Sequence, residues 1–286
     1  IILNAIKSTG RAENLELQIR KASGELIWVL FSVFLQKKEN ILETIIVDIT
    51  EQKNVLIELQ KVNFELDNFV YHASHDLRSP LSSILGLVNI YKKETNPSVQ
   101  ADCIDRIESS VKRLDALVGD LLSISRNNRV NDPLKEFNFL VEINNSINNY
   151  FSGLETNNLD IRVLVRQPMP FASDLTRVRV ILNNLISNAI KYRDLNKNLS
   201  IITINVKVSE KSALFTIEDN GQGIEKNKID QIFDMFVRAN ETSQGSGLGL
   251  YIVKNAIDKL DGTIKLETKD GVGSTFIVTI PNSYSE

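Results

Sequence analysis

Hydrophobic and polar positions divide the chain into three blocks, and the first, residues 1–50, has a strand pattern. Runs rich in β-branched and aromatic residues cover residues 15–19, 27–35 and 41–49. Turn-like segments separate these runs, which predicts an antiparallel sheet. Because three strands in about fifty residues have little core of their own, we expect half of a larger domain or a sheet that packs on another part.

The second block, residues 51–130, repeats its apolar positions every three or four residues, the period of an amphipathic helix. Asn96 and Pro97 interrupt the pattern as a helix stop, which predicts two long helices joined as an antiparallel hairpin. A lone hairpin leaves its apolar faces in water, so we expect a homodimer that buries them as a four-helix bundle. The apolar rows are Leu59, Val62, Leu66, Phe69, Ala73, Leu77, Ile84 and Val88, then Val99, Cys103, Ile107, Val111, Leu114, Val118 and Leu121.

The third block, residues 131–286, mixes the two periods. Helical patterns and alternating strand patterns each occur in clusters, which favours an α+β sandwich over a doubly wound parallel sheet. The predicted helices cover residues 141–154, 174–193 and 248–260, and the predicted strands cover residues 201–208, 214–218, 263–268 and 275–280.

Composition narrows the class of protein. The chain has 286 residues and a formal net charge of −3, which argues against a nucleic-acid binder because such a protein needs a basic face. The single cysteine, Cys103, can form no internal disulfide and no zinc site alone. The only histidines, His72 and His75, lie three residues apart and have no third strong ligand in an obvious pattern.

No apolar run approaches the roughly 18 residues that indicate a membrane span, and no signal peptide is visible. We therefore expect a cytoplasmic chain with no membrane contact of its own. The chain begins with Ile1 rather than Met, so we expect a fragment of a longer protein, whose membrane anchoring is left open.

His75 is the first candidate for chemistry. At about 100° per residue, and with Phe69 at zero, most of the apolar row falls within about 80° while His75 falls near 240°. The imidazole should therefore be exposed, and the carboxylate of Asp76 beside it can orient the ring and raise its basicity. The alternative is an ordinary solvated surface histidine.

Two glycine-rich segments of the third block are candidates for ligand binding. Residues 219–223, Asp-Asn-Gly-Gln-Gly, follow a strand, where the carboxylate of Asp219 can accept a hydrogen bond from an exocyclic amine. Residues 245–249, Gly-Ser-Gly-Leu-Gly, precede a helix, whose N-terminus can cradle phosphate. A tight turn and a flexible hinge are the respective alternatives.

Asn184 and Asn188 lie four residues apart and so share one helix face, with Lys191 and Tyr192 just beyond. Carboxamide oxygens suit Mg²⁺, which commonly shares phosphate ligands, and Lys191 can meet a phosphate as a point charge. The alternative is a polar helix face. The asparagine helix and the two glycine-rich segments occur in this order in one small domain, and together they are a much stronger signal than any one of them.

These motifs resemble those of the sensor histidine kinases of two-component systems. Residues 69–81, Phe-Val-Tyr-His-Ala-Ser-His-Asp-Leu-Arg-Ser-Pro-Leu, are similar to the H-box of that family, with His75 at the phospho-acceptor position. Asp174 and Arg177 fit the approach to the N-box. The remaining motifs follow in the family's order: the N-box at 184–192, the first glycine box at 219–224, the F-box at 232–236, the second glycine box at 245–250 and the closing strand at 271–276.

The resemblance, which covers residue 52 to the end, implies a domain order. Residues 51–130 would be the dimerisation and histidine phosphotransfer hairpin, and residues 131–286 a Bergerat-type ATP-binding sandwich. Residues 1–50 resemble the C-terminal part of a PAS sensor domain, with residues 21–25 as its hairpin. Residues 48–53, Asp-Ile-Thr-Glu-Gln-Lys, resemble the motif that links PAS domains to the next helix.

The resemblance also implies the roles of single residues. ATP would bind with its adenine amine on Asp219 and with Mg²⁺ held by Asn188, residues 225–244 would form a lid, and residues 126–133 a mobile linker. The implied nucleotide-binding residues are Asn184, Asn188, Lys191, Tyr192, Asp219, Gly221, Gly223, Ile224, Phe233, Gly245, Gly247, Leu248, Gly249 and Thr275.

The implied reaction is autophosphorylation of His75, with Asp76 orienting the ring or taking its proton. The phosphoryl group would then pass to an aspartate on the receiver domain of a separate response regulator. Asp76 stands where the family more often has Glu, and Ser79 stands where it usually has Thr or Asn. In relatives that second residue positions water for dephosphorylation of the regulator, so Ser79 leaves the phosphatase activity open.

Three other functions were weighed against this one. A chaperone- or topoisomerase-type ATPase of the same fold uses a Glu to activate water, and the corresponding residue here, Asn184, is a poor base. A dimeric scaffold with a degenerate ATP domain is disfavoured because the expected nucleotide residues are present. A kinase that acts mainly as a phosphatase differs too little in sequence to be distinguished.

Overall fold

The computed structural model describes residues 9–36, 41–129, 133–151, 158–237 and 246–284. The chain splits into two compact units, residues 1–73 and residues 74–286, and each is described by itself. The boundary falls within the first long helix.

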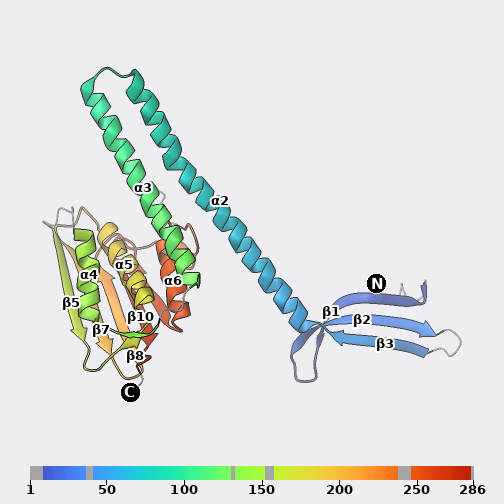
Figure 1. The fold of residues 1–286 in the computed structure, drawn as a ribbon. Coiled ribbons are helices and arrows are strands. Elements are labelled where there is room, and N and C mark those ends of the chain that lie inside the picture. Colours follow the sequence, from blue (N-terminus) through green and yellow to red (C-terminus); the bar gives the residue numbers. More distant parts are fainter. Residues whose placement is uncertain (1–8, 37–40, 130–132, 152–157, 238–245, 285–286) are drawn as a thin grey trace. The chain divides into compact units, whose positions relative to one another are not determined.

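Three antiparallel strands form the sheet of the first unit, as expected from the sequence (Figure 1). They are β1 (Arg11–Arg20), β2 (Leu26–Gln36) and β3 (Ile41–Asp48), in the order β1-β2-β3. Residues of β1 and β2 supply the small core, whereas β3 is exposed along its whole length. The expectation of a thin sheet is confirmed.

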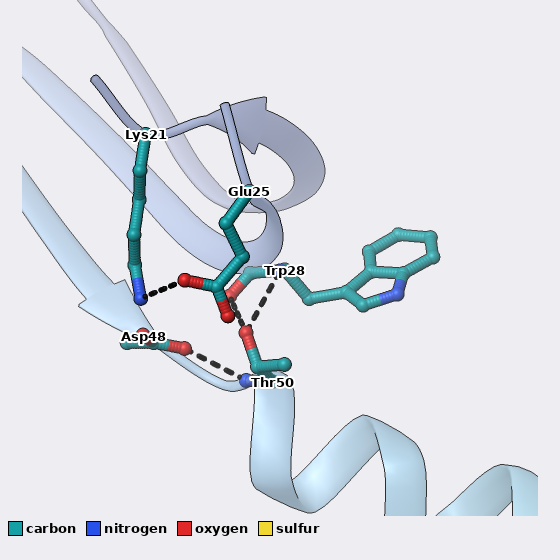
Figure 2. A network of polar contacts seen from close by, with 5 residues as sticks. All are labelled: Lys21, Glu25, Trp28, Asp48 and Thr50. Carbon is teal, nitrogen blue, oxygen red and sulfur yellow. Dashed lines mark hydrogen bonds and ion pairs between the residues drawn. The ribbon is translucent and has the colours of Figure 1, made fainter. Parts of the chain in front are cut away.

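The end of the sheet is tied to the start of the next helix around Thr50 (Figure 2). The backbone N–H of Thr50 donates to Asp48 Oδ1 at 2.9 Å, and its hydroxyl accepts from the backbone N–H of Trp28 at 3.0 Å. The hydrogen bonds from Thr50 hold the pKa of the Asp48 carboxyl below its usual value. Lys53, one turn into the helix, pairs with Glu16 and lies 5.6 Å from the centre of the Trp28 ring.

Two long helices follow, α2 (Thr50–Lys93) and α3 (Pro97–Arg129), which confirms the predicted hairpin (Figure 1). Pro97 begins α3 rather than ending α2, because proline lacks the N–H that a first helical residue leaves unused. The connection is held by Glu94, whose carboxylate accepts from the N–H of Thr95 and of Asn96. These bonds lower the pKa of Glu94.

The rest of the second unit is the predicted α+β sandwich (Figure 1). Its five-stranded sheet has the order β5-β7-β8-β10-β9, and only β5 and β7 are parallel. The strands are β5 (Leu159–Arg166), β7 (Ser200–Val208), β8 (Ser212–Asp219), β9 (Thr263–Lys269) and β10 (Gly273–Pro281). The helices are α4 (Phe139–Phe151), α5 (Leu175–Lys191) and α6 (Gly249–Lys259), with a short η1 (Lys226–Lys228) and a minor sheet of β4 (Lys135–Glu136) and β6 (Ala172–Ser173).

The sequence reading missed β5. Its signal was present, because Leu159, Ile161, Val163 and Val165 alternate with polar residues in all but one position. A strand at the edge of the sheet that pairs in parallel with β7 needs no hairpin turn, so no turn motif marked it.

The core of the sandwich lies between one face of the sheet and the three helices. Alternate residues of β7, Ile202, Ile204, Val206 and Val208, are buried against them. Asp174 caps α5: it accepts from the N–H of Arg177 at 3.0 Å and its carboxylate pairs with the buried Arg177 guanidinium. The cap fixes where α5 begins and therefore where its asparagines lie.

Candidate functional site

One cavity of about 1090 Å³ brings together most of the predicted site residues. Its walls come from α2, α3, α5, the loop after β8, the start of α6 and β10. The predicted residues that line it are His75, Asp76, Ser79, Asn184, Asn188, Lys191, Tyr192, Asp219, Gly223, Ile224, Gly247 and Gly249.

His75 lies on the hairpin wall of this cavity and is exposed, as its angular position predicted: 72% of its side chain is accessible. Its Nδ1 atom lies 3.1 Å from Asp76 Oδ1. With the proton on Nδ1 donated to this carboxylate, the Nε2 atom keeps its lone pair and is free to act as a nucleophile. Ser79, one helical turn further on, lines the same cavity.

The asparagine face of α5 forms the opposite wall. Asn184 Nδ2 donates to the backbone oxygen of Val180 at 2.8 Å, so its Oδ1 atom remains an acceptor. That oxygen faces the first residue of α6: a methyl group on Gly249 would lie 3.0 Å from Asn184 Oδ1 and 4.0 Å from Asn188 Nδ2. The side-chain amides of two asparagines and a helix N-terminus thus meet at one place, which suits an anion and its cation.

Lys191 is the cation at this end of α5. Its ammonium nitrogen lies 4.9 Å from the centre of the Tyr192 ring, and both residues line the cavity. A point charge beside amide oxygens and a helix N-terminus can bind phosphate.

Asp219 ends strand β8 and turns its carboxylate into the cavity. Oδ1 accepts from the N–H of Gly221 at 2.8 Å, which folds the loop back over the side chain. Burial raises the pKa of Asp219, and hydrogen bonds from the backbone of Gly221 and Ser274 and the charge of Lys197 act against that rise. A half-buried carboxylate at a strand end can accept a hydrogen bond from a donor on a ligand.

The glycine at position 223 is required by the backbone. It has a φ of +70°, and a β-carbon there would lie 2.1 Å from the backbone oxygen of Lys269. The loop after β8 therefore packs directly on the β9–β10 turn, where Gly271 N donates to Gln222 O at 2.7 Å.

The segment before α6 is held against helix α3. Ser246 Oγ donates to Asp120 Oδ2 at 2.5 Å, and Leu248 packs with Leu117 and Ile252 in a small buried cluster. Burial raises the pKa of Asp120, against the hydrogen bond from Ser246 and the charge of Lys191. The start of α6 is thus positioned by polar and apolar contacts together.

Some predicted binding residues lie elsewhere. Phe233 packs on the main core, and Leu248 is buried in the cluster with α3. Thr275 alternates with Ser274 and Phe276, which line the cavity, so its side chain points to the other face of the sheet. Gly221 does not line the cavity, but its backbone N–H donates a hydrogen bond to the Asp219 carboxylate.

Other predicted parts fall wholly or partly outside the described residues. Gly245 is not described, nor are residues 238–244 of the predicted lid and residues 130–132 of the predicted linker.

Two residues that hold segments around the cavity, Asp120 and Lys197, were not predicted from the sequence. Asp120 had a signal, because it continues the spacing of three and four from Leu117 to Ile124 and so places a carboxylate on an apolar face. Lys197, which contacts the loop after Asp219, had none: a lysine in a polar connection looks like any solvated charge.

Two kinds of feature are absent from the described part of the chain. No three His, Cys, Asp or Glu residues there are grouped to hold a metal ion. No helix there is long and apolar enough to span a membrane.

Two protein-family models match separate segments of the chain. Residues 65–129 match the His Kinase A (phospho-acceptor) domain, and residues 173–284 match the histidine kinase-, DNA gyrase B- and HSP90-like ATPase family. The chain belongs to the two-component sensor histidine kinases. This confirms the family resemblance, the helical hairpin and the α+β domain expected from the sequence.

Curated histidine kinases match most of this chain. The methanogenesis regulatory histidine kinase FilI of Methanothrix harundinacea is 31% identical over 78% of the chain and 25% of its own length. The aerobic respiration control sensor protein ArcB of Escherichia coli is 29% identical over 82% of the chain and 31% of its own length. The chain therefore spans about a quarter to a third of these kinases.

Solved structures share the fold. The histidine kinase ThkA, solved in complex with the response regulator protein TrrA, superposes with a TM-score of 0.61 at 22% identity, over 99% of this chain and 82% of that one. The histidine kinase AdeS of Acinetobacter baumannii gives a TM-score of 0.57 at 24% identity, over 73% of this chain and 98% of that one.

Proposed function

We propose that this chain catalyses ATP-dependent phosphorylation of its own His75 and then passes the phosphoryl group to an aspartate of a response regulator. One observation carries the proposal: a single cavity is lined by the exposed His75–Asp76 pair and by the Asn184, Asn188 and Asp219 side chains. A phosphoryl donor and its acceptor need such a shared space.

The nucleotide end of the cavity suits ATP. The carboxylate of Asp219 accepts the exocyclic amine of adenine, while the N–H of Gly221 holds its other side in place. Asn188, with Asn184 beside it, holds Mg²⁺, and Lys191 binds phosphate at the N-terminus of α6. When bound, Mg²⁺ neutralises charge on the phosphates. The donor set fits, because Mg²⁺ prefers oxygen ligands and completes its shell with water and phosphate.

At the acceptor end, Asp76 orients the ring through Nδ1 so that Nε2 attacks the γ-phosphorus of ATP. An N–P bond forms, the bond to the β,γ-bridging oxygen breaks, and ADP leaves with that electron pair. Asp76 stabilises the positive charge that develops on the imidazole. Lys191 offsets negative charge on the transferred group, so most of the catalysis is positioning and electrostatics.

Ser79 supplies a hydroxyl to the same cavity, one helical turn after His75. It orients the water that dephosphorylates the regulator, though more loosely than a β-branched Thr would. One relative is named a sensor kinase/phosphatase, the LuxQ protein of Vibrio harveyi, at 29% identity.

The hairpin forms the homodimer. Many of its apolar residues are exposed in the single chain, among them Leu59 at 55% and Val111 at 49%, although Ala73, Cys103 and Leu117 are buried. Burial of such rows in a four-helix bundle removes this apolar surface from water. Further exposed apolar residues of the two helices include Val55, Val62, Leu66, Leu81, Leu85, Ile104, Val118 and Leu122.

The N-terminal sheet is the C-terminal part of a PAS-like sensor domain. Its support is the strand order and the Asp48–Thr50 junction, which couples β2 and β3 to the start of α2 (Figure 2). The response regulator as partner is supported by the family and by the TrrA complex in which ThkA was solved.

Autophosphorylation with γ-labelled ATP and Mg²⁺ tests the proposal. The wild-type chain should gain acid-labile, base-stable label, and His75→Ala should gain none while it binds ATP with unchanged affinity. His72→Ala is the matched control and should keep the label. Label that survives in His75→Ala, or wild-type protein that fails to bind ATP, would overturn the proposal.

A further inference from the structure

The ammonium group of Lys197 is surrounded by backbone carbonyl oxygens. It lies 2.6 Å from Asn220 O and 3.2 Å from Gly221 O, in the loop after β8. On its other side it lies 3.1 Å from Gly271 O and 3.1 Å from Val272 O, in the β9–β10 turn. One positive charge thus joins four carbonyl groups of two loops. Lys197 itself belongs to the segment between α5 and β7.

The first of these loops is the one that shapes the Asp219 carboxylate. The Gly221 peptide donates its N–H to Asp219 Oδ1 at 2.8 Å, while its carbonyl group accepts from Lys197. The same residue is therefore fixed at both ends. Without the ammonium group these carbonyls lose a charged hydrogen-bond donor, and the Gly221 peptide loses one of the contacts that fix its orientation.

Lys197 does not line the cavity, so it acts on the site through the loop. Its charge also opposes the rise in the pKa of Asp219 that burial causes, which favours the ionised carboxylate. The hydrogen bonds and the charge of Lys197 therefore act in the same direction. Both favour an ionised, oriented Asp219 carboxylate that can accept a hydrogen bond from the ligand.

We propose that Lys197 is a positioning residue for nucleotide recognition: its ammonium group clamps the carbonyls of Asn220 and Gly221 to the β9–β10 turn and so aims the Asp219 carboxylate at the adenine amine. This inference rests on the proposed function, because it takes ATP as the ligand of the cavity. It goes further in naming a residue outside the cavity as a determinant of base selectivity.

Base selectivity separates this role from a merely structural one. Inosine triphosphate carries a carbonyl where ATP carries the exocyclic amine, so a well-aimed carboxylate favours ATP over inosine triphosphate. General destabilisation of the domain would lower both affinities equally. If the Asp219 carboxylate loses its orientation, the affinity for ATP falls more than the affinity for inosine triphosphate.

The experiment compares the Kd of both nucleotides for wild-type protein and Lys197→Met, which keeps the length and removes the charge. The Kd for ATP should rise about tenfold or more. The Kd for inosine triphosphate divided by the Kd for ATP should fall by a similar factor. Lys207→Met, an exposed lysine on β7, is the control and should change neither Kd. An unchanged ratio in Lys197→Met overturns the inference. Wild-type protein that binds no ATP overturns the proposed function itself.

A measurement on the wild-type protein covers the case in which Lys197→Met does not fold. Ammonium protons held by four carbonyls should exchange slowly enough to give a resolved ¹⁵N–¹H signal, unlike those of exposed lysines. The signal should shift when ADP binds and stay in place with inorganic triphosphate. A Lys197 ammonium group that exchanges as fast as the exposed ones contradicts the clamp.

Discussion

Helices α2 and α5 both have an apolar stripe at helical spacing, yet they differ in what covers it. Helix α5 has 17 residues, and eight of them are buried against the sheet and the neighbouring helices. Helix α2 has 44 residues, and Ala73 is the single buried hydrophobic residue among its described side chains. The stripe of α5 is covered within the chain, whereas the stripe of α2 is the surface through which we propose that a second copy binds.

The difference teaches that periodicity predicts a helix but not the partner of its apolar face. The helix with the covered stripe holds Asn184 and Asn188, the proposed nucleotide residues, whereas the helix with the uncovered stripe holds the exposed His75. A kinase that must bring acceptor and nucleotide together repeatedly can use a rigid site on one part and an assembled bundle on the other.

The largest expected effect is on the covered core. Leu182→Ala removes a fully buried side chain of α5 and should cost about 3–5 kcal/mol of unfolding free energy in the ATP domain. Leu66→Ala, on α2, removes a side chain that is 55% accessible in the single chain and should leave that domain's stability unchanged. Calorimetry with and without ATP measures the first effect.

Analytical ultracentrifugation measures the effect of Leu66→Ala on dimerisation. Leu66→Ala should weaken dimerisation because, in the proposed four-helix bundle, burial of this exposed side chain stabilises the dimer. A Leu66→Ala protein that stays as dimeric as the wild type, or whose ATP domain is destabilised like that of Leu182→Ala, contradicts the difference between the two stripes.

An intermediate effect is expected at Asp219. Asp219→Asn replaces the acceptor by an amide and should raise the ATP Kd about ten- to hundredfold, since a charged hydrogen bond is lost. Glu218→Gln is the matched control, because Glu218 is exposed and should leave the Kd unchanged. Equal effects of the two variants on titration calorimetry would contradict the assigned acceptor.

The pH dependence of ATP binding follows from the raised pKa of Asp219. The ionised form accepts the adenine amine, so affinity should be lost as the pH falls through a midpoint above the ordinary value of 3.8. The stability of the protein without ATP should depend on pH in the opposite direction. Because the pKa of Asp219 is higher in the folded than in the unfolded state, its contribution to the free energy of unfolding falls as the pH rises through the same window. Asp219→Asn should remove the titration from both curves.

The smallest expected effect is at Asp120, which joins α3 to the segment before α6. Asp120→Ala removes the hydrogen bond to Ser246 and should slow autophosphorylation several-fold, with the ATP Kd unchanged. Asp115→Ala, an exposed neighbour on α3, should change neither quantity. An equal change in Kd and rate would show that Asp120 belongs to the nucleotide site instead.

How much the sequence could predict depended on whether local pattern or distant contact decided the residue. His75 was expected to be exposed because a helix fixes angles, and the α+β sandwich was expected because elements clustered. Thr275 was placed in the site by resemblance, although strand alternation turns it away and brings Ser274 in. Lys197 could not be found, since its four carbonyl partners lie 23 to 75 residues away along the chain.

The most direct test of the central claim is to locate the phosphoryl group itself. The wild-type chain is incubated with ATP and Mg²⁺ at neutral pH, digested without acid and analysed by fragmentation that keeps phosphohistidine intact. We expect one phosphoryl group, on the imidazole of His75. A phosphoryl group on His72 or on any other residue, or none in protein that binds ATP, would contradict the account.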